Sequence, residues 1–302
     1  MFDGVFPMLP TVFSGGDVDF PAISRLVDDA LAQGVDGLAI MGLAAEVRCL
    51  SPEERSQVVE AAVRAVGGRC PTLVGVSADD TPTACRLAAE AASFGADLLM
   101  VAPPAVAGLT ADQQVEHFTA VASAARGAMI MLQDAPNELG VMLQPETIIR
   151  IVERAPNVRY AKLEGHNTGQ AVSDLLATDV GRHLTFFGGT GGLHYLDLLD
   201  AGVTGVIPAF EAPAVFREIT RRYRMGDREG ARALHLKLMP FLVFKAQSLP
   251  LSVLAVKEVL AARGIIGSAH ARIAPPLRSW SRKIALRHAE AAGLLSVRTG
   301  SQ

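Results

Sequence analysis

Four short segments of the chain repeat one pattern, in which a glycine is followed at once by an apolar run. They cover residues 34–40, 95–101, 127–133 and 202–208, and each follows a stretch with helical periodicity. A glycine is common where a helix ends, and a short run that is wholly apolar is typical of a strand buried on both faces. The pattern therefore predicts helices that alternate with parallel strands.

Extending this pattern along the chain predicts eight strands. They span about 4–12, 36–41, 72–77, 97–102, 128–133, 157–163, 183–188 and 203–208. Eight strands alternating with helices over about 225 residues predict an α/β fold, a (β/α)8 TIM barrel. A doubly wound open sheet is the second interpretation, but no Gly-rich phosphate fingerprint follows the first strand.

The rest of the chain predicts helices only. We expect the barrel to span residues 1–225 and a C-terminal extension of three helices to span 226–302. No linker separates the two parts, so the extension is expected to pack on the barrel and not to be independent. Helix starts are predicted at three caps, with capping boxes at Ser51 and Thr110 and a Thr81 cap before Pro82.

Composition excludes several classes of protein. The net charge is −3 without a basic stripe, which gives no indication of nucleic-acid binding. No apolar run reaches the roughly 18 residues of a membrane span, and the N-terminus lacks the positive region of a signal peptide. Three widely spaced cysteines and unpatterned histidines predict reduced thiols, a cytoplasmic protein and no metal site.

Function in such a barrel lies where the strands end, and one lysine stands out there. Lys162 ends the sixth strand and is the only lysine in the first 236 residues. Because side chains alternate along a strand, Glu164 shares its face. A buried lysine becomes a neutral amine more readily, and a neutral amine can attack a carbonyl group. The alternative is a structural ion pair between Lys162 and Glu164 at the rim.

Other strand ends supply further candidate residues. The segment "GGTGG" (188–192), with Gly189 and Thr190, could cradle a phosphate or carboxylate or could simply form a tight turn. Glu46 could pair with Arg48. The polar residues expected at the mouth of the barrel are Gln133, Asp134 and Glu211, while His166 is expected to be an ordinary loop residue.

The order and spacing of several segments resemble the dihydrodipicolinate synthase and N-acetylneuraminate lyase family of class I aldolases. The matching segments include "GVFPMLPTVF", "LSPEER", "QDAP", "AKLEG" and "GVTGVIPA", and the resemblance covers about residues 1–295. It implies a barrel with a C-terminal helical extension. It also implies that Lys162 forms a Schiff base with pyruvate or another 2-oxo acid, without a cofactor or metal, in a homo-oligomer (dimer or tetramer).

The chain also departs from the family pattern. The family usually has Gly-Thr-Thr-Gly-Glu after the second strand, where this chain has "GLAAE" (42–46), and Tyr-Asn-x-Pro after the fifth, where it has "QDAP" (133–136). Gln133 therefore occupies the usual tyrosine position, and a glutamine cannot relay a proton as a phenol can. Backbone N–H groups could still hold a carboxylate; this segment contains Leu43, Ala44, Ala45 and Glu46.

These observations predict a Schiff-base-forming lyase, an aldolase or dehydratase, acting on a 2-oxo acid or related carbonyl compound. Lys162 is the expected nucleophile, and Glu164 is the favoured acid or base. Substrate contacts are expected from the "GLAAE" segment, Asp134, Gly189, Thr190 and Glu211. Three alternatives stay open: a non-catalytic ligand-binding barrel, an authentic dihydrodipicolinate synthase, and an isomerase that grips phosphate with "GGTGG".

Overall fold

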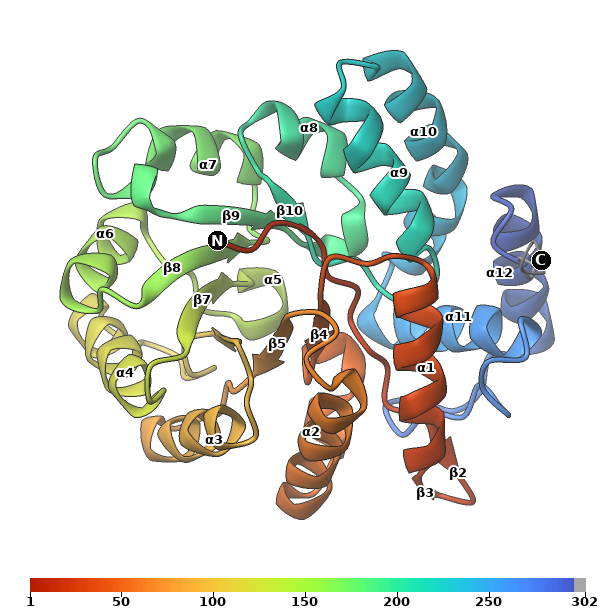
Figure 1. The fold of residues 1–302 in the computed structure, drawn as a ribbon, viewed down its shortest axis with the longest axis horizontal. Helices are drawn as coiled ribbons and strands as arrows, with labels where there is room; N and C mark the ends of the chain where they lie inside the picture. Colours follow the sequence, from red (N-terminus) through yellow and green to blue (C-terminus); the bar gives the residue numbers. More distant parts are fainter. Residues whose placement is uncertain (296–302) are drawn as a thin grey trace.

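Eight parallel strands form a closed barrel in the computed structural model, which describes residues 1–295 (Figure 1). The sheet runs in the order β1-β10-β9-β8-β7-β6-β5-β4. The segment after β1 closes it, because Leu9 N–H donates to Ala39 O (2.7 Å) and Ala39 N–H donates to Pro7 O (3.1 Å). The predicted barrel is confirmed. Its strands are β1 (Gly4–Val5), β4 (Leu38–Ile40), β5 (Thr72–Gly75), β6 (Leu98–Val101), β7 (Met129–Asp134), β8 (Val158–Leu163), β9 (Thr185–Gly188) and β10 (Gly205–Val206).

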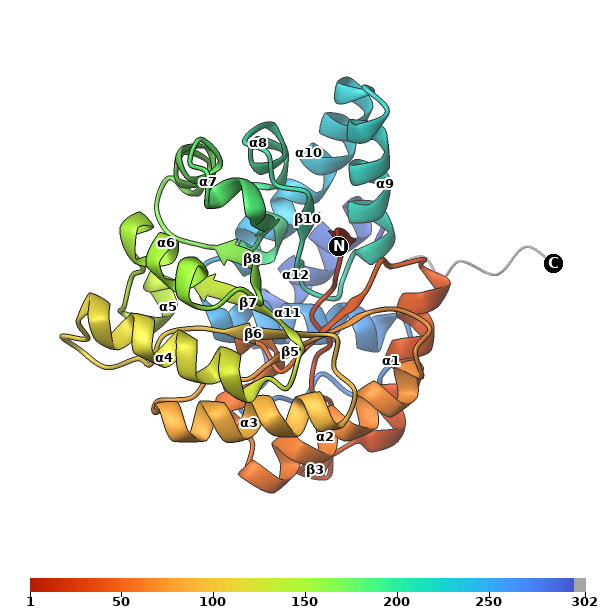
Figure 2. The same ribbon diagram turned by 60° about the vertical axis from the view of Figure 1, so that its left-hand side comes forward.

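Helices surround the barrel on its outside and connect its strands (Figures 1 and 2). A small antiparallel hairpin, β2 (Phe13–Ser14) with β3 (Asp17–Val18), precedes the first of them. The connecting helices are α1 (Phe20–Ala32), α2 (Pro52–Val66), α3 (Thr81–Ser93), α4 (Ala111–Ala124), α5 (Pro136–Leu139), α6 (Pro145–Arg154), α7 (Thr168–Leu176), α8 (Tyr195–Asp200) and α9 (Pro213–Arg224). Short 3₁₀ turns follow two strands: η1 (Leu43–Ala45) and η2 (Val47–Cys49) come after β4, and η4 (Thr190–Gly192) comes after β9. A further turn, η3 (Gly181–His183), lies between α7 and β9.

The helix starts test the predicted caps. Ser51 and Thr110 each form the predicted capping box. The predicted Thr81 cap is wrong, because Asp80 caps α3 and accepts the N–H of Thr83 at 2.7 Å. The Thr81 hydroxyl instead lies 2.9 Å from His117 Nδ1.

The inside of the barrel is filled with side chains below its mouth. Phe6, Met100, Met131, Tyr160 and Phe187 belong to one buried cluster. Tyr160 is fully buried, and its hydroxyl accepts the N–H of Phe2 (2.8 Å) at the bottom of the barrel. A packed interior leaves the mouth as the end where a ligand can enter.

Up to residue 295, three helices follow the barrel, as predicted: α10 (Arg228–Lys245), α11 (Leu249–Ala262) and α12 (Ser279–Ala291). They share a hydrophobic cluster with α8, α9 and the first strand, which includes Val5, Tyr195, Phe216 and Phe241. The boundary at residue 225 stays a prediction, and residues 296–302 of the predicted extension lie outside the described residues.

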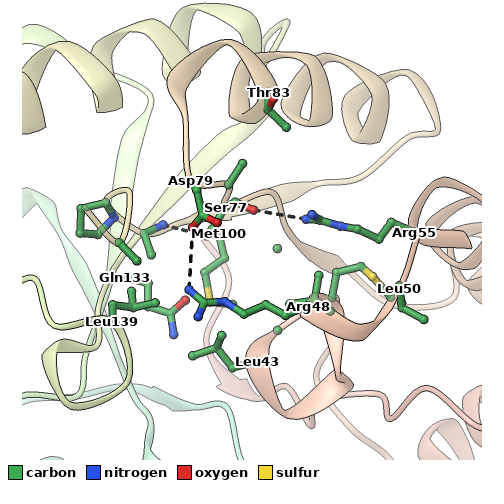
Figure 3. Close-up of a pocket in the computed structure, with 18 of the residues that line it drawn as sticks. Leu43, Arg48, Leu50, Arg55, Ser77, Asp79, Thr83, Met100, Gln133 and Leu139 are labelled. Atoms are coloured by element: carbon green, nitrogen blue, oxygen red, sulfur yellow. Dashed lines mark hydrogen bonds and ion pairs between the residues drawn. The ribbon is translucent and has the colours of Figure 1, made fainter. Parts of the chain in front are cut away.

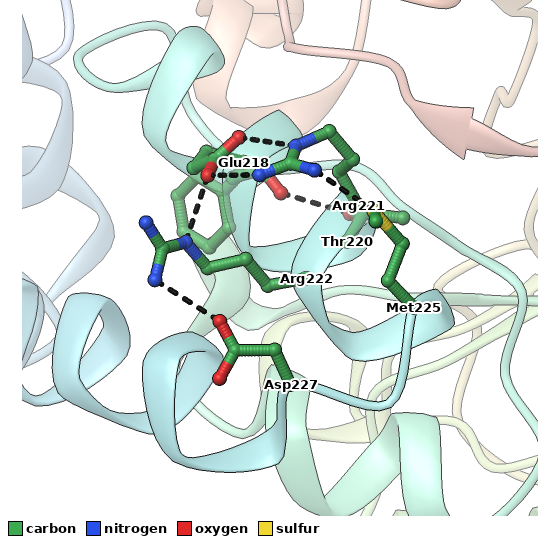
Figure 4. A network of polar contacts seen from close by, with 7 residues as sticks. Glu218, Thr220, Arg221, Arg222, Met225 and Asp227 are labelled. Atoms are coloured by element: carbon green, nitrogen blue, oxygen red, sulfur yellow. Dashed lines mark hydrogen bonds and ion pairs between the residues drawn. The ribbon is translucent and has the colours of Figure 1, made fainter.

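The junction of α9 and α10 is held by an exposed network of charges (Figure 4). Arg221 and Arg222 both donate to Glu218, and Arg222 also donates to Asp227, which caps α10. Hydrogen bonds from the two arginines lower the pKa of Glu218 to about 2, so its carboxylate stays ionised at neutral pH. This network fixes the start of α10, whose far end reaches the mouth of the barrel.

Helix α11 is buried along most of its length. It buries eight consecutive residues, 253–260, and packs on η1 and on α12. Within residues 1–295 no helix is long and apolar enough to cross a membrane. The apolar surface of α11 is thus covered within the protein, and the helix forms part of the wall around the mouth of the barrel.

Candidate active site

A pocket of about 150 Å³ lies between the mouth of the barrel and the C-terminal extension. Strand ends, η1 and η4 form one side, and the junction of α10 with α11 forms the other. The polar and charged side chains that line it are Gln133, Glu138, Lys162, Glu164, Thr190, Lys245, Ser248 and Ser252. The extension is therefore part of the site.

Lys162 lies near the end of β8 and points into this pocket. Its side chain is 8% exposed, and its Nζ lies 2.6 Å from Glu164 Oε2. The predicted alternation along the strand holds, since Tyr160 lies one step lower among the interior residues. Strand β8 thus places the amine of Lys162 at the mouth of the barrel, with the carboxylate of Glu164 directly beside it.

Glu164 is the centre of the polar contacts in the pocket. Besides Lys162, it accepts hydrogen bonds from Gln133 Nε2 (2.8 Å) and from Thr190 N–H (2.7 Å). Burial alone would raise the pKa of Glu164, but the charge of Lys162 and these hydrogen bonds outweigh burial, so the pKa is lowered. Glu164 is therefore an ionised carboxylate while Lys162 is an ammonium.

The glycines of "GGTGG" make room for this carboxylate. A Cβ placed on Gly189 would lie 2.3 Å from Glu164 Oε1, so no larger residue fits without moving Glu164. The next N–H, that of Thr190, is donated to Glu164. The turn thus binds the carboxylate of Glu164, which is part of the protein, through a backbone N–H group. Gly189 itself is outside the residues that line the pocket, whereas Thr190 is among them.

The "GLAAE" segment divides into two parts. Leu43 and Ala44 line the pocket, while Ala45 is fully buried and does not. Glu46 contacts Lys257, and its Oε2 accepts the N–H groups of Arg272 (2.7 Å) and Ile273 (2.9 Å). The predicted pairing of Glu46 with Arg48 is therefore wrong; a carboxylate paired with Lys257 anchors the segment that follows α11.

Asp134 and Glu211 also lie outside the residues that line the pocket. Asp134 ends β7 and accepts the N–H of Leu143 (2.9 Å), which ties down the loop around α5. Glu211 follows β10 and lies 2.5 Å from Lys245 Nζ. His166 is an exposed loop residue, as expected. Substrate contacts by Asp134 and Glu211 stay predictions.

Burial of Asp134 leads to a prediction about stability and pH. Burial raises the pKa of Asp134 from 3.8 to about 6, although the Leu143 N–H opposes the shift. Between these values the folded protein keeps a proton that the unfolded chain has lost, so stability falls as the pH rises. We expect Asp134→Asn, which keeps the acceptor for Leu143, to raise the free energy of unfolding by about 1–3 kcal/mol at pH 8.

Urea unfolding at pH 8 and at pH 4 measures this difference. The increase in the free energy of unfolding caused by Asp134→Asn should shrink towards zero at pH 4, where Asp134 is protonated in the folded wild-type protein. The exposed Asp179→Asn is the matched control and should change stability little at either pH. An equal gain at both pH values would contradict a buried ionisable carboxyl group.

A second cavity of about 430 Å³ adjoins the first (Figure 3). The two share Gly42, Leu43, Met100 and Gln133. Arg48 and Arg55 line the second cavity; Arg48 lies 3.9 Å from Asp79, and Arg55 donates to the carbonyl group of Ser77 (3.2 Å). A ligand that contacts Lys162 could therefore extend past Gln133 into a space lined by two guanidinium groups and by the carboxylates of Asp79 and Asp80.

Sequence reasoning missed Lys245 as a site residue. It is the last residue of α10, its side chain is 3% exposed, and it lines the same pocket as Lys162. A search restricted to strand ends could not find it, because it comes from the helical extension. The available signal was the scarcity of lysine, since Lys245 is one of five in the chain.

Comparisons with known proteins show the family of this chain. A model of the dihydrodipicolinate synthetase family matches residues 1–292. The 4-hydroxy-tetrahydrodipicolinate synthase of Bacillus subtilis is 29% identical over 280 residues, covering 91% of this chain and 94% of that protein. The enzyme of the same name from Parasynechococcus marenigrum is 32% identical over 267 residues, covering 87% of this chain and 86% of that protein.

Solved structures give the same result. Dihydrodipicolinate synthase from Thermotoga maritima matches with a TM-score of 0.90 and 25% identity, over 98% of this chain and 100% of that one. A prophage protein of E. coli K12 from the same family, solved in complex with pyruvate, matches with a TM-score of 0.90 and 25% identity, over 97% and 99%. This chain belongs to the dihydrodipicolinate synthetase family, whose members are Schiff-base lyases of the class I aldolase type.

Proposed function

We propose that this protein forms a Schiff base between Lys162 and a 2-oxo acid and then cleaves a C–C or C–O bond of that substrate. The observation that carries the proposal is the contact between Lys162 Nζ and Glu164 Oε2, 2.6 Å, in a pocket at the mouth of the barrel. An amine next to a proton acceptor is the arrangement that nucleophilic attack on a carbonyl carbon requires.

Glu164 can supply the proton transfers of the first step. Its carboxylate takes a proton from the Lys162 ammonium, and the neutral amine bonds to the carbonyl carbon. Once Lys162 is neutral, the charge that lowers the pKa of Glu164 is gone, and burial then raises that pKa. In the adduct, the nitrogen gives one proton to the former carbonyl oxygen, which becomes a hydroxyl group. The protonated Glu164 then gives its proton to that hydroxyl group, which leaves, so the ammonium and the ketone yield a protonated imine and one water.

The protonated imine acts as an electron sink for the second step. In C–C cleavage, the electrons of the breaking bond flow towards the imine nitrogen and leave an enamine on Lys162, while the hydroxyl group of the departing fragment loses its proton and becomes a carbonyl group. In C–O cleavage, the carbon next to the imine first loses a proton to give the enamine, and the enamine then expels the hydroxyl group, which takes up that proton and leaves as water. Gln133 cannot take the proton that a phenol would take at this position. Glu164 is the ionisable carboxyl group closest to Lys162 in the pocket, and we assign it this proton as well.

The second cavity supports a substrate larger than pyruvate. Its volume of about 430 Å³ adjoins the Lys162 pocket, and its charged lining, Arg48 and Arg55 together with Asp79 and Asp80, can contact polar groups of such a substrate. The reaction that gives the similar proteins their name is the second candidate. It is favoured by the identity of about 30% over most of the chain, and an assay for 4-hydroxy-tetrahydrodipicolinate formation tests it directly.

Borohydride trapping tests the proposed Schiff base. We expect pyruvate, 2-oxobutyrate or 2-oxoglutarate with borohydride to add one reduced adduct per chain, located by peptide mass on Lys162. Borohydride without an oxo acid is the control. Because Lys245 lines the same pocket, the adduct must be mapped. Labelling of Lys245 in place of Lys162, or no adduct with any of the three acids, would refute the proposal.

A further inference from the structure

Two buried lysine–glutamate pairs join the barrel to its extension, and their surroundings differ. Lys257 contacts Glu46, and Lys245 contacts Glu211, with all four side chains no more than 3% exposed. Burying two charges costs several kcal/mol per ion unless hydrogen bonds satisfy the remaining donors and lone pairs. The hydrogen bonds of each pair therefore distinguish a structural role from a functional one.

Both members of the Lys257–Glu46 pair make further hydrogen bonds within the protein. Lys257 also donates to His270 O (2.9 Å), and Glu46 accepts two backbone N–H groups. The pair ties α11 and the segment after it to the loop that follows β4. It lies outside the residues that line the pocket, and its role is structural.

The Lys245–Glu211 pair is not satisfied in this way. The two charged groups are 2.5 Å apart, yet Lys245 Nζ and both carboxylate oxygens of Glu211 make no well-oriented hydrogen bond to any residue in 1–295. An ammonium has three N–H donors, and buried polar atoms nearly always have partners. Lys245 therefore has donors to spare for a ligand.

Lys245 borders the pocket, whereas its partner Glu211 does not. Lys245 is among the residues that line the pocket with Lys162, whereas Glu211 is not. The turn that seats Glu164 also makes room for Lys245, because a Cβ on Gly191 would lie 3.0 Å from Lys245 Nζ. The charged side chain that borders the pocket is thus a cation whose Nζ is buried beside it, and Glu211 pairs with this cation from outside the lining.

The small size of the pocket brings a ligand close to both lysines. Its volume is about 150 Å³, which suits a small molecule such as a short-chain oxo acid. In a 2-oxo acid the carboxylate is bonded directly to the carbonyl carbon. A substrate whose carbonyl carbon is bonded to Lys162 therefore keeps its carboxylate within this small pocket, where Lys245 is the second ammonium.

We propose that Lys245 binds the carboxylate of the 2-oxo acid while its carbonyl carbon is bonded to Lys162. Glu211 is the positioning residue that holds the Lys245 ammonium. This assignment rests on the proposed function and adds a specificity determinant to it, because it selects a 2-oxo acid over an uncharged carbonyl compound of similar size.

The test compares pyruvate with methyl pyruvate, which has the same carbonyl group without the charge. Lys245→Met should raise the pyruvate concentration that gives half-maximal borohydride trapping on Lys162 by about 10- to 100-fold, as expected for a lost hydrogen bond to a charged group. The half-maximal concentration of methyl pyruvate should stay within about twofold of wild type. Lys237→Met, on an exposed position of the same helix, is the matched control.

A double variant separates this role from a folding defect. Lys245→Met alone leaves Glu211 buried without a partner, so Lys245→Met with Glu211→Gln removes both charges. The double variant should unfold at a temperature close to that of wild type. Its half-maximal trapping concentration should be raised for pyruvate and not for methyl pyruvate, as in Lys245→Met. The assignment would be overturned if the half-maximal concentration of pyruvate were unchanged in these variants, or if it rose equally for pyruvate and methyl pyruvate. Absence of any adduct in the wild-type protein would instead refute the proposed function itself.

Discussion

Replacing Lys162 by methionine is expected to abolish adduct formation and to lower turnover by about 10⁴-fold or more, the scale seen when a covalent nucleophile is removed. Methionine is close to lysine in length and has no amine, so it fills the same space in β8. The measurement is borohydride trapping followed by peptide mass, with steady-state kinetics once a substrate is found.

Two control variants separate the loss of the amine from a loss of stability. Lys162→Met leaves Glu164 without its cation, so the thermal unfolding of this variant should be compared with that of the double variant Lys162→Met with Glu164→Gln, in which the unpaired charge is also removed. Lys237→Met should be trapped as wild type is. An adduct that persists on Lys245 in the Lys162→Met protein would show that the wrong lysine has been assigned.

The fold was predictable because its signal is local. A glycine after a helical stretch marks the start of a buried strand at four places, and extending this alternation along the chain gave the eight strands of the barrel. The ends of the outer strands were less predictable. The first strand was expected to reach residue 12, but Pro7 and Pro10 lack the N–H that a regular ladder needs, so β1 ends at Val5. Pro208 limits β10 in the same way.

The candidate site was predictable only along single strands. The contact of Lys162 with Glu164 follows from the alternation of side chains in β8. The partners from elsewhere in the chain did not follow, because they depend on how distant segments meet. Thr190 N–H reaches Glu164 from η4, and Lys245 reaches the pocket from α10. No local pattern encodes either contact.

The same limit explains Glu46. As a strand-end carboxylate it was expected to bind substrate or to pair with Arg48. Its cation is Lys257, which α11 carries to it from the far end of the chain. A buried carboxylate needs a cation and hydrogen-bond donors to offset the loss of solvent, and Lys257 with two backbone N–H groups supplies them. Arg48, although nearer in sequence, is exposed and lies next to Asp79.

Glu164→Gln is expected to slow Schiff-base formation by about 10²- to 10⁴-fold, the usual contribution of a positioned acid or base. Glutamine keeps the size of the side chain and an oxygen that can accept the Thr190 N–H, but it cannot carry a proton between Lys162 and the departing water. Single-turnover trapping with pyruvate at a saturating concentration measures the rate. The concentration for half-maximal trapping should change less, since the carboxylate of the substrate is assigned to Lys245.

The pH dependence of trapping distinguishes a proton carrier from a simple counter-ion. In wild type the reaction needs the ionised form of Glu164, whose pKa lies below 4.5 in the resting pocket. The contribution of Glu164 should therefore persist at pH 5 and be lost only as the pH falls through that lower value. Glu164→Gln should lack this acid limb, whereas Glu164→Asp should keep it at a reduced rate. Trapping in Glu164→Gln that is as fast as wild type, or faster, would mean that Glu164 only restrains the Lys162 ammonium, and proton transfer would then have to be assigned to another group in the pocket.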